Sequence, residues 1–246
     1  MIMDAVILDV GGVLLVPHAD VVSLVLAPFG VRLDMQAAER AHYVGIHALD
    51  AAEDDPQGRR AYLEAYSETV GVPAADRDEA VSRMTELWGG STLDLWRQRV
   101  SGSVDGLRRL ASTGRKLGIV SNADGSIEEQ LRRNEICQLG EGLGVPVLAI
   151  VDSYVVGVAK PAAEIFSHAL DPLGVAPEQA VYVGDTVRYD VSGARAAGLY
   201  PVHFDPYNLC RDQRDHAHVR SLGDVENLLS SWRERDQIGP QRNCHP

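Results

Sequence analysis

The amino-acid sequence predicts an α/β fold in which a doubly wound parallel sheet carries an inserted helical cap. Short apolar runs alternate with helical patterns over most of the chain. The runs are mostly continuous rather than alternating, which is typical of strands buried on both faces of a parallel sheet. The first run ends at residue 8 and the second begins at residue 117, so a long insertion must separate the first two strands.

Five apolar runs bounded by turn residues are predicted to be the strands. They are Ala5–Leu8, Leu117–Val120, Val147–Val151, Ala180–Val183 and Pro201–Phe204. The helices predicted between them are Val104–Ser112, Ser126–Asn134, Ala162–Leu170 and Asp190–Ala197. This alternation implies right-handed crossovers in a parallel sheet, and active sites in such sheets lie at the carboxyl ends of the strands.

The connection between the first two strands is too long for one crossover, which needs roughly 30 residues for the whole unit. Helical patterns at Leu33–Ala48 and Arg59–Val70 predict a helical cap over the carboxyl edge, with Gly89-Gly90-Ser91 as a hinge on its return. We therefore expect an α/β core at residues 1–16 and 96–232 and a cap at residues 17–95. Residues 233–246 are polar without an apolar period and are expected to form a loose tail.

Composition and charge argue against several classes of protein. A formal net charge of −12 argues against nucleic-acid binding, which favours concentrated basic surface. No segment approaches the roughly 18–20 uninterrupted apolar residues of a membrane span, and the start of the chain lacks the basic region of a signal peptide. An acidic protein that binds an anion needs a local cation or basic side chain to offset the repulsion.

The three cysteines, Cys137, Cys210 and Cys244, lie far apart in the chain, and none has CxxC spacing. This pattern argues against a zinc site and against a disulfide framework. It fits a reducing compartment, so we expect a cytoplasmic protein. The sequence leaves the oligomeric state open.

Polar residues stand at or shortly after four of the predicted strands. They are Asp9, then Ser121 and Asn122, then Lys160, and finally Asp185 and Asp190. Because parallel strands end at one edge of a sheet, we expect these side chains to converge. An ionised carboxylate such as that of Asp9 can attack phosphorus and form an aspartyl-phosphate. Magnesium prefers oxygen ligands and usually takes one or two carboxylates together with waters and substrate phosphate.

Taken in order, these four segments resemble the motifs of the haloacid dehalogenase superfamily, specifically the branch with a helical insertion after the first strand. The most specific segment is Gly184-Asp185-x-x-x-x-Asp190-x-x-Gly193-Ala194-x-x-Ala197-Gly198. The resemblance covers most of the chain. It implies a Rossmann-like core and a magnesium-dependent phosphatase that hydrolyses a small phosphorylated metabolite.

The resemblance also implies a role for each polar residue. Asp9, Asp185 and the backbone carbonyl of Gly11 would bind Mg²⁺, and Asp190 would hold a water ligand of the ion. The side chains implied for the phosphoryl group are those of Ser121, Asn122 and Lys160. Bound Mg²⁺ and the lysine would then be the local cations that an acidic protein needs.

The chain departs from the family pattern at Gly11, where the phosphatases usually carry a second aspartate. That aspartate protonates the leaving oxygen and then activates water, and such help is worth roughly 10²–10⁴ in rate. His18 and Asp124 follow strand ends and are candidate substitutes. Other candidates for substrate contact come from the insertion, and they are Arg40, His42, His47, Arg59, Arg60, Tyr62 and Tyr66. Trp88 and Trp96 are expected to pack at its return rather than bind a ligand.

Three other functions stay open beside the phosphatase. The glycine at position 11 suggests a catalytically weakened binding or regulatory protein. A 2-haloacid dehalogenase would use Asp9 without a metal, but the acidic pair Asp185 and Asp190 would then have no role. A phosphomutase would need the same acid-base help that Gly11 cannot give.

Overall fold

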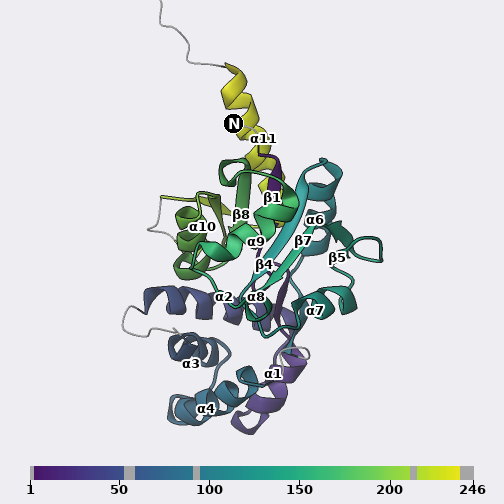
Figure 1. Cartoon of the computed structure of the whole chain (residues 1–246). Helices are drawn as coiled ribbons and strands as arrows, with labels where there is room; N and C mark the ends of the chain where they lie inside the picture. Colours follow the sequence, from purple (N-terminus) through teal and green to yellow (C-terminus); the bar gives the residue numbers. More distant parts are fainter. Residues whose placement is uncertain (1–2, 53–58, 91–94, 211–214, 239–246) are drawn as a thin grey trace, which may run out of the picture.

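The computed structural model describes residues 3–52, 59–90, 95–210 and 215–238. Its centre is a six-stranded sheet in the order β10-β9-β8-β1-β4-β7, with every neighbouring pair parallel (Figure 1). The strands are β1 (Ala5–Leu8), β4 (Lys116–Ser121), β7 (Ala149–Asp152), β8 (Ala180–Gly184), β9 (Tyr200–Phe204) and β10 (Ala217–Val219). The predicted parallel α/β fold is therefore confirmed.

Strand β1 shows why the apolar runs are continuous. It lies between β4 and β8, and all four of its residues are fully buried. Val6 and Leu8 belong to the hydrophobic core on one face of the sheet, whereas Ala5 and Ile7 belong to the core on the other. Successive side chains of a strand point to opposite faces, so a strand covered on both sides needs an apolar residue at every position.

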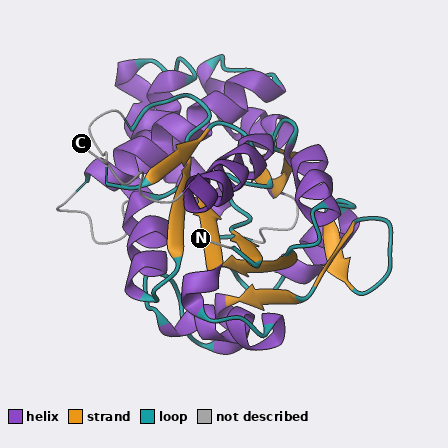
Figure 2. Ribbon diagram, turned by 90° about the horizontal axis from the view of Figure 1, so that it is seen from above, coloured by secondary structure: helices purple, strands orange, loops and turns teal. Residues whose placement is uncertain are grey.

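Helices cover both faces of the sheet (Figure 2). The first face is covered by α6 (Ser103–Ser112), α7 (Ile127–Arg133) and α11 (Leu222–Ile238). The second is covered by α9 (Glu164–Leu173) and α10 (Ser192–Ala196). Shorter elements complete the core, namely α8 (Ser153–Val156), the 3₁₀ turn η3 (Pro177–Gln179) and the π-helical turn η4 (Val187–Val191).

Among the described residues, four helices are inserted between β2 (Leu15–Pro17) and β3 (Trp96–Arg99), at one end of the sheet (Figure 1). They are α1 (Ala19–Leu26), α2 (Met35–Ala51), α3 (Arg59–Thr69) and α4 (Arg77–Trp88), with the 3₁₀ turns η1 (Ala27–Phe29) and η2 (Ala74–Asp76). The inserted helices have a hydrophobic core of their own, built around Leu63, Tyr66 and Met84. The chain enters and leaves the insertion through the antiparallel ribbon of β2 and β3.

Several elements differ from the sequence prediction. The ribbon β2–β3, strand β10 and the pair β5 (Cys137–Leu139) and β6 (Val145–Val147) were not predicted, because three or four residues are too few to show a period. The predicted strand Val147–Val151 is divided at Leu148, which is 54% exposed. The loose tail expected from Arg233 is corrected, since α11 continues to Ile238. Of the expected hinge, Gly89 ends α4, and Ser91 lies outside the described residues.

Within the described ranges, no helix combines the length and hydropathy that a membrane crossing requires. The longest helices, α2 and α11, each have 17 residues. Both carry charged residues along their length, and α2 also covers part of the apolar interior.

Candidate active site

The carboxyl edge of the sheet brings together the polar residues that the sequence singled out. Lys160 lies at the centre, with Nζ 2.9 Å from Oδ2 of Asp9 and 2.7 Å from Oδ1 of Asp190. Asp185 follows β8, and Ser121 is the last residue of β4. All five residues are buried. The expected convergence of these side chains is therefore what the structure shows.

Asp190 is held by the turn that carries it. Its Oδ2 accepts hydrogen bonds from the backbone N–H of Thr186 at 2.9 Å and from the Thr186 hydroxyl at 2.6 Å. Burial alone would raise the pKa of Asp190, but the charge of Lys160 and these hydrogen bonds together lower it. Gly184 leaves room for the carboxylate, since a Cβ there would lie 2.3 Å from Cγ of Asp190.

Tyr182 is a site residue that the sequence did not indicate. It lies in the apolar run of β8, and its hydroxyl accepts from Lys160 Nζ at 2.8 Å and donates to the carbonyl of Val120 at 2.9 Å. Burial raises the pKa of the Tyr182 phenol well above its usual range, so the group stays neutral. Tyr182 thus holds the ammonium group of Lys160 toward the two carboxylates.

The side chain of Asn122 forms two hydrogen bonds with the backbone of Lys160. Its Oδ1 accepts from the Lys160 N–H at 2.8 Å, and its Nδ2 donates to the Lys160 carbonyl at 3.0 Å. We expected this amide to contact the phosphoryl group, but both ends of it are engaged in holding the lysine. Its geometry therefore fits a positioning residue.

Three buried carboxylates provide a site for a metal ion. Asp9, Asp185 and Asp190 each offer one oxygen, and these oxygens all lie within 4.8 Å of one another. Lys160 supplies a single positive charge against three carboxylates. Burial raises the pKa of Asp9 to about 7 although Lys160 opposes the shift, and burial together with the charge of Asp190 raises that of Asp185 well above its usual range. The donor set and its excess negative charge fit a hard divalent cation such as Mg²⁺.

Gly12 is needed where the chain turns past this site. Its φ is +67°, a left-handed conformation that favours glycine. A Cβ at this position would lie 1.8 Å from Oδ2 of Asp185. Gly11, in contrast, has no positive φ, and a Cβ there would be 3.4 Å from the ring of Trp96. The indole therefore lies beside position 11, where the resemblance described above leads us to expect an aspartate.

His42 reaches the site from helix α2 of the insertion. Its Nε2 lies 3.1 Å from Oδ2 of Asp185, and its Nδ1 lies 2.9 Å from the hydroxyl of Tyr62. Burial lowers the pKa of His42 to about 3, so the ring is neutral. The ionised form of Asp185 only accepts, so with that form Nε2 of His42 carries the proton and the Tyr62 hydroxyl donates to Nδ1.

A cavity of about 890 Å³ opens above these groups. Its walls come from both the core and the insertion. Asp9, Ser121 and Lys160 lie on the core side, and Arg59 and Tyr62 lie on the side of the insertion. A small molecule in this cavity would therefore contact the carboxylates and the inserted helices at the same time.

The two candidates for the missing acid lie in different places. His18 caps α1, with Nδ1 accepting from the backbone N–H of Asp20 at 3.2 Å, and it is not among the described residues that line the cavity. Asp124 does line the cavity, and its Oδ1 accepts from the backbone N–H of Ser126 at 3.2 Å. The structure thus separates the pair and leaves only Asp124 beside the cavity.

Of the candidates in the insertion, three line the cavity, namely His42, Arg59 and Tyr62. His47 borders a smaller neighbouring cavity, and Arg40 lies over the ring of Tyr207. Arg60 forms ion pairs with acidic neighbours, and Tyr66 is buried in the helical core. Trp88 and Trp96 pack against that core as expected, but both also line the cavity.

Comparisons with known proteins agree with the fold. The haloacid dehalogenase-like hydrolase of Bacillus subtilis named YfnB, solved with magnesium bound, superposes with a TM-score of 0.60 at 18% identity, over 93% of this chain and 99% of that one. A phosphatase of the same superfamily from Thermococcus onnurineus superposes with a TM-score of 0.54 at 21% identity, over 92% and 98% of the two chains. At these identities the likeness concerns the fold alone.

Sequence comparison identifies the family. The phosphoserine phosphatase of Thermus thermophilus is 32% identical over 161 residues, which are 65% of this chain and 59% of that protein. The glyceraldehyde 3-phosphate phosphatase of Methanopyrus kandleri is 49% identical over 53 residues, or 22% of this chain and 23% of the relative. The matches thus span 59% and 23% of the lengths of these relatives. A family model of haloacid dehalogenase-like hydrolases matches residues 3–198, and the chain accordingly belongs to that family.

Proposed function

We propose that the protein is a magnesium-dependent phosphatase that hydrolyses a small phosphorylated metabolite through an aspartyl-phosphate on Asp9. The observation that supports this most is the buried group of Asp9, Lys160 and Asp185 on one wall of a cavity of about 890 Å³, with Asp190 paired to Lys160. A buried carboxylate beside a lysine, with two more carboxylates for a cation, suits attack on a phosphate ester.

In the first step an oxygen of Asp9 attacks phosphorus, and the bond from phosphorus to the ester oxygen breaks. In the second step water attacks the same phosphorus, the bond to Asp9 breaks, and inorganic phosphate leaves with the carboxylate restored. Lys160, 2.9 Å from Asp9, offsets the negative charge that gathers on the phosphoryl group. The hydroxyl of Ser121 borders the same cavity and would donate to a phosphoryl oxygen.

The residues that would hold Mg²⁺ are Asp9, Asp185 and the carbonyl of Gly11. When bound, the ion would neutralise charge on the phosphoryl oxygens and on the carboxylates. Asp190 already accepts from Lys160 and from Thr186, so its proposed role is to hold Lys160 and a water ligand of the ion rather than to bind the ion directly. In this division of roles one oxygen of Asp9 binds the ion and the other is the nucleophile.

The leaving oxygen has no acid at position 11. The ring of Trp96 lies where a Cβ of residue 11 would point, 3.4 Å away, and Asp124 borders the cavity from another strand end. We infer that the best substrates carry a leaving group that departs with little protonation. Arg59, on the wall formed by the insertion, would attract an anionic part of the leaving group.

The test is turnover of an aryl phosphate by the parent and by Asp9→Asn, with Mg²⁺ and after chelation. We expect activity only in the parent with Mg²⁺. The matched control is Asp20→Asn, an exposed aspartate outside the cavity, which should behave as the parent does. Equal turnover in the parent and Asp9→Asn would refute the assigned nucleophile.

Gly11 also favours a second candidate, a protein that binds a phosphorylated ligand without turning it over. A panel of phosphorylated sugars, nucleotides and short-chain acids distinguishes the two. Binding across the panel with no release of phosphate would support the regulatory role. Turnover of haloacids that persists in chelator would instead indicate a dehalogenase.

A further inference from the structure

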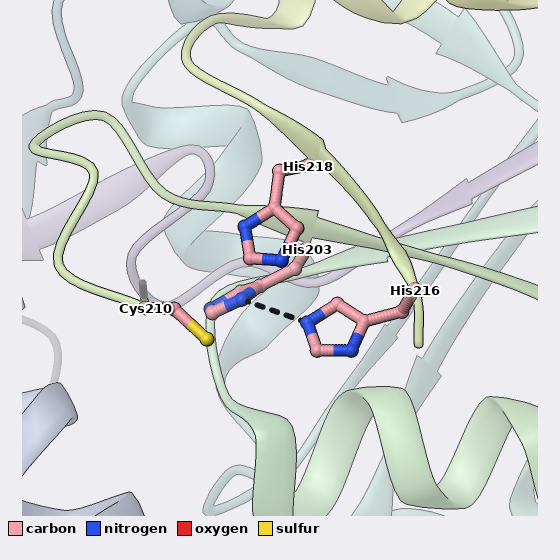
Figure 3. A group of neighbouring side chains, drawn as sticks. All are labelled: His203, Cys210, His216 and His218. Atoms are coloured by element: carbon pink, nitrogen blue, oxygen red, sulfur yellow. Dashed lines mark hydrogen bonds between the residues drawn. The ribbon is translucent and has the colours of Figure 1, made fainter. Parts of the chain in front are cut away.

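A second group of side chains with metal-ligand chemistry lies at the edge of the sheet, and none of them lines the cavity above the carboxylates. It consists of His203, Cys210, His216 and His218, which we call the histidine-cysteine cluster (Figure 3). Each residue offers one nitrogen or sulfur atom, and these atoms all lie within 4.8 Å of one another. The phosphatase mechanism uses none of them.

Two neighbouring strands place the histidines. His203 in β9 is directly opposite His218 in β10, and their ring centroids are 5.0 Å apart. His216 immediately precedes β10, two residues before His218, and the rings of His216 and His218 stack at 4.5 Å. The spacing His-x-His at the start of β10, next to a third histidine in β9, therefore gathers three imidazoles.

Cys210 is brought to the cluster by a capped loop. The buried carboxylate of Asp205 accepts from the backbone N–H of Leu209 at 2.9 Å and from that of Cys210 at 3.0 Å. The same carboxylate lies 3.8 Å from Nδ1 of His218. Asp205 thus fixes the loop that carries the thiol and lies behind one of the imidazoles.

The hydrogen bonds of His203 and His216 decide where their protons are. Nε2 of His203 lies 2.9 Å from the carbonyl of Asp185, and Nδ1 of His216 lies 2.7 Å from Oδ1 of Asp215. A carbonyl and a carboxylate only accept, so each of these nitrogens carries the proton of its ring. In a neutral imidazole the other nitrogen then has a lone pair.

Those two lone pairs face each other. Nδ1 of His203 and Nε2 of His216 are 3.3 Å apart, the contact drawn in Figure 3. Two lone pairs at this distance repel each other unless a cation lies between them.

We propose that the histidine-cysteine cluster binds a Zn²⁺ ion through His203, Cys210, His216 and His218. In tetrahedral zinc sites the bonds to nitrogen are about 2.0–2.1 Å, which places two ligand nitrogens about 3.3 Å apart. The separation of the His203 and His216 nitrogens equals that value. Asp215 and the carbonyl of Asp185 occupy the outer nitrogens, as second partners of zinc-bound histidines do.

The cluster is distinct from the carboxylate site in chemistry as well as in place. Nitrogen and sulfur donors select Zn²⁺, whereas carboxylates and carbonyls select Mg²⁺. Four protein ligands also leave no open position, which is typical of a structural rather than a catalytic zinc site. A cavity of about 80 Å³ borders His203 and Cys210 and gives the ion a path of entry.

The test is a zinc titration of the reduced, full-length protein against a chromophoric chelator, in excess Mg²⁺. We expect one tightly bound Zn²⁺ per chain in the parent and also in Asp9→Asn, so the result does not depend on the proposed phosphatase. Asp215→Asn replaces the charged outer partner of His216 by a neutral amide, and it also removes an exposed ion pair with Arg195. It should weaken zinc binding roughly 10–100-fold. Cys210→Ser and His216→Gln should weaken it by at least as much.

Matched controls come from the same residue types. Cys137→Ser changes a buried thiol in β5, and His168→Gln changes an exposed histidine on α9. Cys244→Ser changes the cysteine that lies outside the described residues. All three should bind zinc as the parent does. With Co²⁺ in place of Zn²⁺, the near-ultraviolet charge-transfer band of a thiolate ligand should be lost in Cys210→Ser alone.

Circular dichroism in chelator checks that each variant keeps the fold of the metal-free parent. If Cys210→Ser or His216→Gln fails that check, the comparison rests on Asp215→Asn, whose side chain is 65% exposed. Zinc binding far below one ion per chain in the parent would overturn the proposal. Equal affinity in the parent, Asp215→Asn and the ligand variants would overturn it as well.

Discussion

His42 donates a hydrogen bond from Nε2 to Oδ2 of Asp185 across 3.1 Å, and this bond joins helix α2 of the insertion to the end of strand β8. Both residues are almost completely buried. Tyr62 supplies the proton on the other side of the imidazole, from helix α3. Two inserted helices therefore fix the orientation of a carboxylate that we propose as a ligand of Mg²⁺.

Replacing His42 should weaken the use of Mg²⁺. We expect His42→Ala to raise the Mg²⁺ concentration needed for half-maximal turnover by roughly 10–100-fold, because an outer partner of a metal ligand is lost. Tyr62→Phe removes only the hydroxyl and should shift the same quantity less, in the same direction. The measurement is the Mg²⁺ dependence of aryl phosphate turnover. An unchanged half-maximal concentration in His42→Ala would show that the imidazole does not orient Asp185.

A side chain at position 12 should disable the site, whereas one at position 11 should not. In Gly12→Ala the Cβ would meet Asp185 at 1.8 Å and the φ of +67° would be strained, at about 1–3 kcal/mol. We expect loss of turnover and a lower melting temperature. Gly11→Ala is the matched control, since its Cβ would meet only the Trp96 ring at 3.4 Å. Thermal unfolding and turnover of both variants check this, and equal behaviour of the two would contradict the structure.

The glycine at position 11 should make the rate depend steeply on the leaving group. We expect turnover by the parent to fall as the pKa of the leaving alcohol rises, because no acid at position 11 protonates the ester oxygen. Gly11→Asp should flatten this dependence and raise the turnover of alkyl phosphates by up to about 10². A series of aryl and alkyl phosphates measures the slope. A shallow slope in the parent would indicate that another group, such as Asp124, already donates the proton.

Asp50 should make the stability of the protein depend on pH. Its carboxylate accepts from the backbone N–H groups of Val187 and Arg188 at 2.8 and 3.0 Å. Burial raises its pKa to about 6, above the value of about 3.9 in an unfolded chain. Between these values the folded protein holds a proton that the unfolded chain has released, so stability is gained as pH falls through 6.

Asp50→Asn has no carboxyl group that can bind this proton. The difference in stability between the parent and this variant therefore isolates the contribution of Asp50. Relative to the variant, the parent should gain about 2 kcal/mol in free energy of unfolding as pH falls from about 7.5 to about 4.5. Urea unfolding of both proteins at a series of pH values measures the difference. If the difference stays constant or grows with rising pH, the carboxylate is not the titrating group.

How far the sequence predicts the molecule depends on the range of the interactions. The run Ala5–Leu8 predicts a strand buried on both faces, because such a strand has apolar residues at consecutive positions. Asp9, Lys160 and Asp190 could be placed together because parallel strands share one edge. These predictions need only local pattern and a general rule of topology.

The remainder depends on contacts between distant elements. His42 is one of several polar residues on a helix, and only the packing of α2 shows that it reaches Asp185. Tyr182 looks like any aromatic residue in an apolar strand. The spacing rules for zinc ligands did not indicate the histidine-cysteine cluster, because its residues come from two strands and a loop. Strand β10, which places His218 opposite His203, has only three residues.

Three polar side chains of helix α2 form hydrogen bonds with the core beside the candidate site. Besides the bond from His42, the hydroxyl of Tyr43 donates to the carbonyl of Gly12 at 2.6 Å, and Asp50 accepts from the turn η4. If α2 moved away from the core, its hydrogen bonds to Asp185, to Gly12 and to the turn η4 would therefore be lost together. If Asp185 binds an ion, that ion and the position of α2 are thermodynamically linked. Binding of the ion would then stabilise the docked position of α2 by the same free energy by which the docked helix increases the affinity for the ion.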